Sequence, residues 1–139
     1  MNQLLKTAFF SAAILSANLA AAAELTIHVD DVKAAGGTIM VALYGSEGTF
    51  LKKPDSATGA PAAPGATTVT FKDLPEGTYA FAIFHDANSN GKMDKNLVGI
   101  PTEDYAFSNN ALGKMGPPSF ADAAFVLPAA GAAVRVSLK

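Results

Sequence analysis

The chain contains one stretch in which oxygen-bearing side chains recur at every second position around a glycine. Calcium takes about six to eight oxygen ligands, and a common calcium loop supplies them from positions one, three and five, from a backbone carbonyl at position seven, and through a water held by position nine. The candidate ligands here are Asp86, Asn88, Asn90, the backbone carbonyl of Lys92, and Asp94. Gly91 stands at position six, where such a loop turns sharply. This spacing predicts a Ca²⁺ site.

The predicted site is incomplete when it is compared with a helix-loop-helix calcium site. Position twelve is Leu97, where those sites have a glutamate that binds the ion through both oxygens. Glu103 and Asp104 are the nearest carboxylates that could supply the missing oxygens. We therefore expect weak binding, with a dissociation constant of about 10⁻⁴ to 10⁻³ M. Asn90 followed by Gly91 is also a favoured tight-turn pair, so a hydrogen-bonded loop without metal remains an alternative.

His85 precedes the loop and raises the question of catalysis. A histidine beside Asp86 could be a base with an orienting carboxylate, but adjacent residues on a strand point to opposite faces. We therefore predict that His85 closes the edge of the core, and we name no catalytic residue. The sequence has no nucleophile elbow, paired-histidine zinc motif, phosphate-binding glycine loop or cysteine. A small hydrolase or metal-dependent enzyme using His85 with Asp86, Glu103 or Asp104 remains the alternative.

The segments around this loop alternate in the manner of half-buried strands. Apolar residues recur at every second position in 24–30 and again in 39–43, and the glycine pair between them predicts an opening hairpin. The segment 45–68 is rich in glycine and proline and is predicted to be a surface loop, mobile at 57–66. A second hairpin is predicted from Val69 onward.

The turn of that second hairpin is predicted at 74–77, and its second strand at 78–85. Both faces of this strand are apolar, which predicts a central strand that anchors the candidate calcium loop. The rest of the chain is predicted to form an irregular crossing at 96–118, one helical turn capped by Ser119, and two strands at 124–127 and 133–138. These elements predict an all-β fold, an antiparallel β-sandwich of roughly six to seven strands.

The ends and the composition of the chain limit the class of protein. Residues 1–23 have the basic start, apolar stretch and small-residue cleavage site of a signal peptide, which leaves 24–139 as one domain with a periplasmic or extracellular location. The best later candidate for a membrane span, 123–134, is short and is interrupted by Pro128 and Gly131. The net charge is −2 with no basic run, so we expect no nucleic-acid partner.

Two resemblances extend this interpretation. The stretch from Phe71 to Tyr79 resembles the Phe-x-x-Leu-Pro-x-Gly-x-Tyr motif of transthyretin-like and carboxypeptidase-regulatory-like sandwiches, which implies an immunoglobulin-like or transthyretin-like topology. More of the chain is similar to a family of secreted bacterial proteins, domain of unknown function 2141 (DUF2141). The matching segments are 85–94, 97–101, 105–110 and 116–123. That resemblance implies a one-domain exported sandwich and brings no activity with it.

Two further comparisons concern function. The loop from Asp86 to Asp94 is similar to calcium loops in the repeated β-sandwich domains of bacterial surface adhesins, where the ion stiffens the module. Transthyretin-like hydrolases that open purine-derived rings end in Tyr-Arg-Gly-Ser, whereas this chain ends in Val136-Ser137-Leu138-Lys139. This difference argues against the enzymatic relative.

The sequence therefore predicts an exported, non-enzymatic module. We expect its calcium loop to stiffen a crossing at 97–118 that is presented to a protein, peptide or glycan partner. Tyr105 and Phe107, followed by Asn109 and Asn110, have a composition used for such contacts. A structural module without any ligand is the remaining alternative.

Overall fold

The structure is a computed structural model that describes residues 22–139, so residues 1–21 of the predicted signal peptide lie outside the described part of the chain. The described residues form eight strands, one short α-helix and one 3₁₀ turn. The strands are β1 (Ala23–Val32), β2 (Thr38–Tyr44), β3 (Ser56–Pro61), β4 (Gly65–Leu74), β5 (Gly77–Asp86), β6 (Tyr105–Phe107), β7 (Phe125–Leu127) and β8 (Ala132–Ser137). The 3₁₀ turn η1 covers Ser108–Asn110, and α1 covers Phe120–Ala123.

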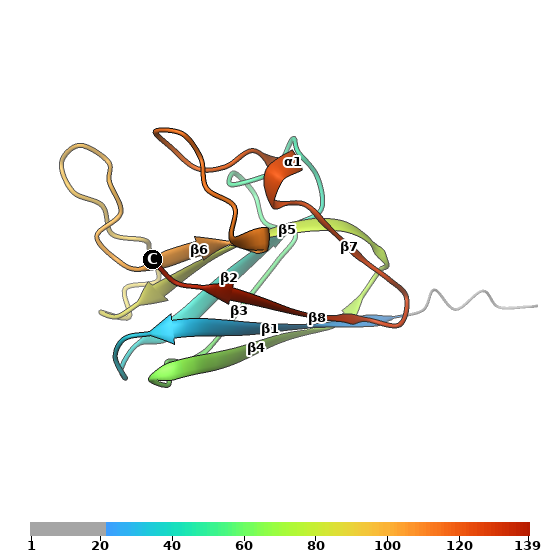
Figure 1. Cartoon of the computed structure of the whole chain (residues 1–139), viewed down its shortest axis with the longest axis horizontal. Coiled ribbons are helices and arrows are strands. Elements are labelled where there is room, and N and C mark those ends of the chain that lie inside the picture. Colours follow the sequence, from blue (N-terminus) through green and yellow to red (C-terminus); the bar gives the residue numbers. More distant parts are fainter. Residues whose placement is uncertain (1–21) are drawn as a thin grey trace, which may run out of the picture.

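Two sheets face each other in this fold (Figure 1). One sheet has the order β4-β1-β8, and the other has the order β3-β2-β5-β6, with β7 paired to the first residues of β5. All neighbours are antiparallel except β1 and β8, which run parallel. The predicted all-β sandwich is confirmed. Among the described residues, no helix has the length and apolar composition needed to cross a bilayer.

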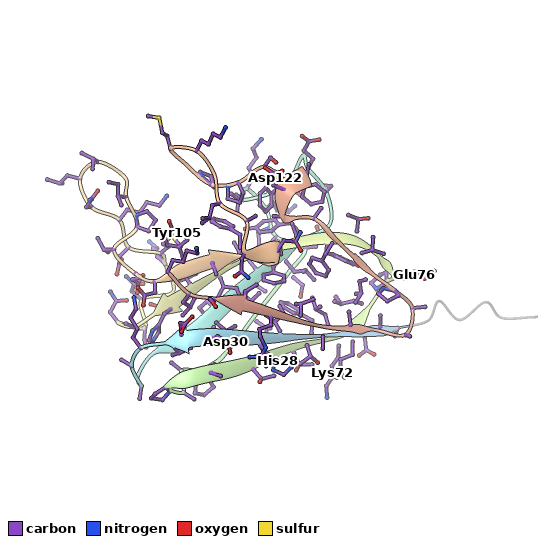
Figure 2. The ribbon with its side chains drawn as sticks, viewed as in Figure 1. His28, Asp30, Lys72, Glu76, Tyr105 and Asp122 are labelled. Carbon is purple, nitrogen blue, oxygen red and sulfur yellow. The ribbon has the colours of Figure 1, made fainter. Side chains whose placement is uncertain are left out.

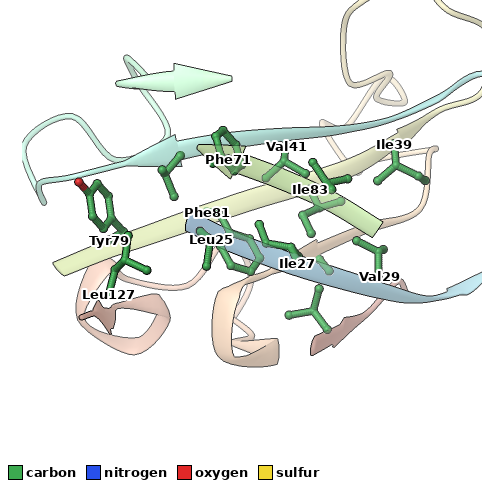
Figure 3. Close-up of a cluster of buried hydrophobic side chains, with 14 of the residues drawn as sticks. Leu25, Ile27, Val29, Ile39, Val41, Phe71, Tyr79, Phe81, Ile83 and Leu127 are labelled. Carbon is green, nitrogen blue, oxygen red and sulfur yellow. The ribbon is translucent and has the colours of Figure 1, made fainter. Parts of the chain in front are cut away.

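The core fills the space between the two sheets (Figure 3). Leu25, Ile27 and Val29 of β1 are buried at alternate positions and pack in one cluster with Phe81 and Ile83 of β5. Each such side chain contributes about 1.5–3 kcal/mol when it is removed from water. The alternation in the first strand and the burial of the core face of β5 are thus confirmed, whereas Ala82 and Phe84 on the other face of β5 are only half-buried. The candidate loop leaves from the end of β5.

Both predicted hairpins are wrong. β1 and β2 lie in different sheets, and so do β4 and β5, because the chain passes from one sheet to the other at 33–37 and again at 75–76. The first crossing passes through two residues with left-handed backbone, Gly36 at φ +101° and Gly37 at φ +69°. Alternation within a strand is the same whether the next strand pairs beside it or packs across the core from it, so the pattern alone could not separate the two arrangements.

The predicted surface loop at 45–68 is also wrong in part. It contains β3, an edge strand that pairs with β2 from Leu43 opposite Ser56 to Thr38 opposite Pro61. β3 has no large apolar residue, so its backbone hydrogen bonds hold it and no hydrophobic alternation marks it in the sequence. β3 and β6, within segments predicted to be irregular, raise the number of strands above the predicted six to seven.

The outer face of the five-stranded sheet carries a second, smaller cluster. The ring of Phe50 lies edge to face with those of Tyr44 and Phe120, at centroid distances of 5.4 and 5.7 Å. Ala80 of β5 and Ala123 of α1 are buried beside them. α1 and the residues around Phe50 therefore cover one end of this face.

The predicted cap of α1 is confirmed. The Ser119 Oγ accepts a hydrogen bond from the Asp122 amide at 3.2 Å. Ser108 is fully buried beneath the helix, where its hydroxyl donates to the Ala123 carbonyl at 2.6 Å and accepts from the Phe81 amide at 3.0 Å. Ser108 thus joins β5, η1 and α1 as a structural residue.

The first crossing yields a test of how the sheets are joined. A Cβ atom on Gly37 would lie 2.1 Å from the Asp86 carbonyl oxygen, whereas a Cβ on Gly36 would meet nothing within 4 Å. Both residues have positive φ, so Gly36→Ala is the matched control for backbone strain. We expect Gly36→Ala to lower the free energy of unfolding by about 1 kcal/mol and Gly37→Ala by about 3 kcal/mol, measured by urea denaturation. Equal losses would contradict this packing.

Candidate functional site

Asp86 ends β5 and is the anchor of the candidate loop. Its side chain is buried, and its Oδ1 and Oδ2 accept hydrogen bonds from the amides of Asn90 at 3.1 Å and Gly91 at 2.8 Å. Its backbone pairs with Thr38 of β2. The loop is therefore fixed at its first residue by the sheet on one side and wraps around the Asp86 carboxylate on the other.

The other predicted ligands form a closed set of hydrogen bonds. The Asp94 carboxylate accepts from the side-chain amide of Asn90 at 2.7 Å through one oxygen and from that of Asn88 through the other. The amide carbonyls of Asn88 and Asn90 accept from the backbone amides of Asn90 and Lys92, at 3.3 and 2.9 Å. The loop thus gathers carboxylate and amide oxygens that satisfy one another without an ion.

The structure separates the two carboxylates that could complete the site. Glu103 lies against the loop, where its Oε2 accepts from the Ala87 amide at 3.1 Å and its Oε1 from the Asp94 amide at 2.8 Å. Asp104 instead forms an ion pair with Lys33 at 3.1 Å. Only Glu103 therefore joins the two ends of the loop.

These contacts define what the loop can do with a cation. Among residues 22–139, no three His, Cys, Asp or Glu side chains are grouped so that they could hold a metal ion. Calcium would depend on the amide and backbone oxygens as well, and on movement of the side-chain amides away from Asp94. Leu97, at position twelve, is fully exposed at the tip of the next turn.

His85 lies on the core side of β5 and is buried, with 6% of its surface exposed. Its Nε2 lies 2.8 Å from the Gly36 carbonyl oxygen, and because a carbonyl can only accept, this nitrogen carries the proton. None of the hydrogen bonds or ion pairs formed by residues 22–139 joins the imidazole to a carboxylate. His85 thus ties the end of β5 to the first crossing.

A groove on the outer face of the five-stranded sheet was not predicted from the sequence. It has a volume of about 780 Å³ and lies over β2, β5 and β6. Its lining includes Ala42, Ala82, Phe84, Tyr105 and Phe107 from the sheet, Met93, Lys95, Val98 and Ile100 from the segment after the loop, and Met115 and Pro117 from the segment before α1. We call it the outer groove.

A run of apolar residues is the one weak indication of this groove in the sequence. Leu97, Val98 and Ile100 are large apolar residues in a segment with turn composition, and the structure exposes all three. Figure 2 shows Tyr105 beneath these loops, on the side of the molecule opposite Lys72. The lining comes from segments far apart in the chain, so spacing alone could not bring them together.

The sequence matches the model of a bacterial family over residues 27–135, from β1 to β8. The family is described as an uncharacterized protein conserved in bacteria (DUF2141). The chain belongs to the DUF2141 family. No curated protein and no solved structure matches it. The DUF2141 match includes both the Asp86–Asp94 loop and the outer groove, and the family description attaches no activity to either.

The role of Glu103 in closing the loop can be tested by hydrogen exchange. We expect Glu103→Ala to speed exchange of the Asp94 amide by about tenfold or more, because this amide donates to the Glu103 carboxylate. The Ala87 amide, which also donates to the His85 carbonyl at 2.9 Å, should change less. Asp104→Ala is the matched control, since it removes the neighbouring carboxylate and its ion pair with Lys33 but leaves both amide bonds in place. The same exchange rates in both variants would show that Glu103 does not hold the loop.

Proposed function

We propose that this DUF2141 protein is an exported, non-enzymatic β-sandwich module whose Asp86–Asp94 loop binds Ca²⁺ weakly. In this proposal the ion stiffens the loop, and the following segment, 97–118, is presented to a protein, peptide or glycan partner. The observation that carries the proposal is that Glu103 accepts hydrogen bonds from the backbone amides at both ends of the loop that contains Asp86 and Asp94. In the proposal, Glu103 takes the place of the glutamate that is absent at Leu97, after the side chains of the loop rearrange around the ion.

The hydrogen bonds in the loop leave capacity for an ion. The carboxylate oxygens of Asp86, Asp94 and Glu103 each accept a single hydrogen bond from the described residues. Carboxylate and amide oxygens have two lone pairs, so a hard cation can use the free ones once the side-chain amides of Asn88 and Asn90 have moved away from Asp94. The fixed position of Asp86 at the end of β5 means that an ion bound there would join the loop to the core.

A loop without metal is the second candidate, and a specific observation favours it. The amides of Asn88 and Asn90 already donate to both oxygens of Asp94, so the loop is satisfied as it stands. A calcium ion must displace at least one of these donors. The two candidates therefore differ in whether millimolar calcium changes the stability of the protein.

Thermal unfolding in calcium, magnesium and chelator tests the proposal. For a dissociation constant of about 1 mM, about 10 mM Ca²⁺ stabilises the native state by about 1.4 kcal/mol and raises Tm by about 5 °C. We expect this shift in the wild type and its loss in Asp94→Asn, which keeps the side-chain size but removes the charge. Magnesium should act more weakly, since it requires a smaller and more regular site.

Asp122→Asn is the matched control for the loss of charge, because Asp122 is an exposed carboxylate on α1, away from the loop (Figure 2). It should keep the full calcium shift. A wild type whose Tm is unchanged by calcium would favour the metal-free loop. An equal shift in the wild type and Asp94→Asn would place the bound ion elsewhere on the protein.

A further inference from the structure

The floor of the outer groove is shaped by two small residues in register. Ala42 of β2 lies directly opposite Ala82 of β5, and Ala82 lies opposite Phe107 of β6. The next row on the same face contains Phe84 opposite Tyr105. Because alanines stand beside aromatic rings, the sheet has a depression here in place of a level surface.

The walls of the groove are apolar and are held in place by the backbone. Lys95 pairs with Pro101, and the Asn96 side chain accepts hydrogen bonds from the amides of Val98 and Ile100, both at 3.0 Å. Val98 is 78% exposed in this conformation. The turn therefore keeps its apolar side chains in solvent beside the groove.

The second wall is the segment before α1. Met115 is fully exposed there and lines the groove together with Pro117. In Figure 1 both segments rise from the five-stranded sheet on the side away from β4, β1 and β8. Large apolar side chains exposed around a concave apolar floor are typical of a ligand site.

The charge of the lining selects one class of ligand. Lys95 is the one charged side chain that residues 22–139 contribute to the lining, and its ammonium forms no hydrogen bond or ion pair with another described residue. Tyr44 is neutral at neutral pH, because the ordinary pKa of tyrosine, 10.0, lies well above that pH and burial of Tyr44 raises its pKa further. An occupant with an apolar body and one negative charge would therefore match both the walls and the lysine.

We infer that the outer groove binds a small anionic amphiphile, such as a fatty-acid anion, with its apolar body over Ala42 and Ala82 and its acidic group at Lys95. The volume of about 780 Å³ lies within the range of about 300–1,000 Å³ that is common for small-molecule sites. This inference goes beyond the proposed function and does not require calcium.

A free amphiphile fits the groove better than a bilayer does. A bilayer would contact the projecting Leu97 and Met115 but would leave the concave alanine floor uncovered. A single chain or ring system can enter the depression and contact the floor and both walls. We therefore assign the groove to a soluble ligand, and binding only to vesicles would contradict the assignment.

The test uses dodecanoate below its critical micelle concentration, with anilinonaphthalene sulfonate as a fluorescent reporter. All titrations are made in chelator, so that failure of calcium binding cannot affect the result. We expect saturable binding with one site per chain by calorimetry, displacement of the reporter by dodecanoate, and much weaker binding of dodecyltrimethylammonium, whose cationic head would meet Lys95.

Two variants locate the site, and a third is the control. Lys95→Glu should weaken dodecanoate binding by about tenfold or more, because it reverses the one charge in the lining. Ala82→Phe should abolish binding of both anions by filling the floor. Lys72→Glu makes the same charge change on an exposed residue of β4, on the far side of the molecule (Figure 2), and should bind like the wild type.

Val98→Ser is a further test of the groove, because Val98 is exposed and can be made polar without changing the fold. This variant should also weaken binding of dodecanoate. Circular dichroism and thermal unfolding establish that each variant is folded. Four results would each overturn the inference: no saturable binding by the wild type, equal affinity in Lys95→Glu, equal affinity for the cationic amphiphile, or association with phosphatidylglycerol vesicles alone.

Discussion

The contact between the first crossing and the end of β5 is the constraint on which the rest of the structure depends. Gly37 packs so closely on the Asp86 carbonyl that no side chain fits between the two backbones, and the imidazole of His85 donates to the Gly36 carbonyl. This contact sets where the chain leaves one sheet and enters the other. It also fixes Asp86, from which the oxygen-rich loop starts, so the position of the loop follows from core packing.

The sequence predicted the strands better than their partners. Leu25, Ile27 and Val29 marked a buried face correctly, because alternation reports burial at each residue. It does not indicate which strand lies alongside, so the pattern wrongly predicts a hairpin at both crossings. Ser56–Pro61 was missed for a different reason: a strand held by backbone hydrogen bonds and built from small residues has no hydrophobic period to detect.

At the candidate site too, the sequence predicts contacts between neighbouring residues better than contacts between distant parts of the chain. The spacing from Asp86 to Asp94 predicts a calcium loop or, as the alternative, a hydrogen-bonded loop without metal, and the structure contains a loop whose backbone amides donate to the Asp86 carboxylate. The sequence offered Glu103 and Asp104 equally, since only the path of the returning chain decides which one reaches the loop. The outer groove could not be predicted from the sequence, because the pairing of Ala42 with Ala82 depends on the register between β2 and β5.

The parallel pairing of β1 with β8 joins the first and last strands of the domain. The central strand of the smaller sheet therefore lacks one neighbour until the final residues of the chain are available. Contacts between distant parts of a chain form slowly, because a long loop must close before they contribute stability. We therefore expect the pairing of β1 with β8, which completes the smaller sheet, to be a late step in folding.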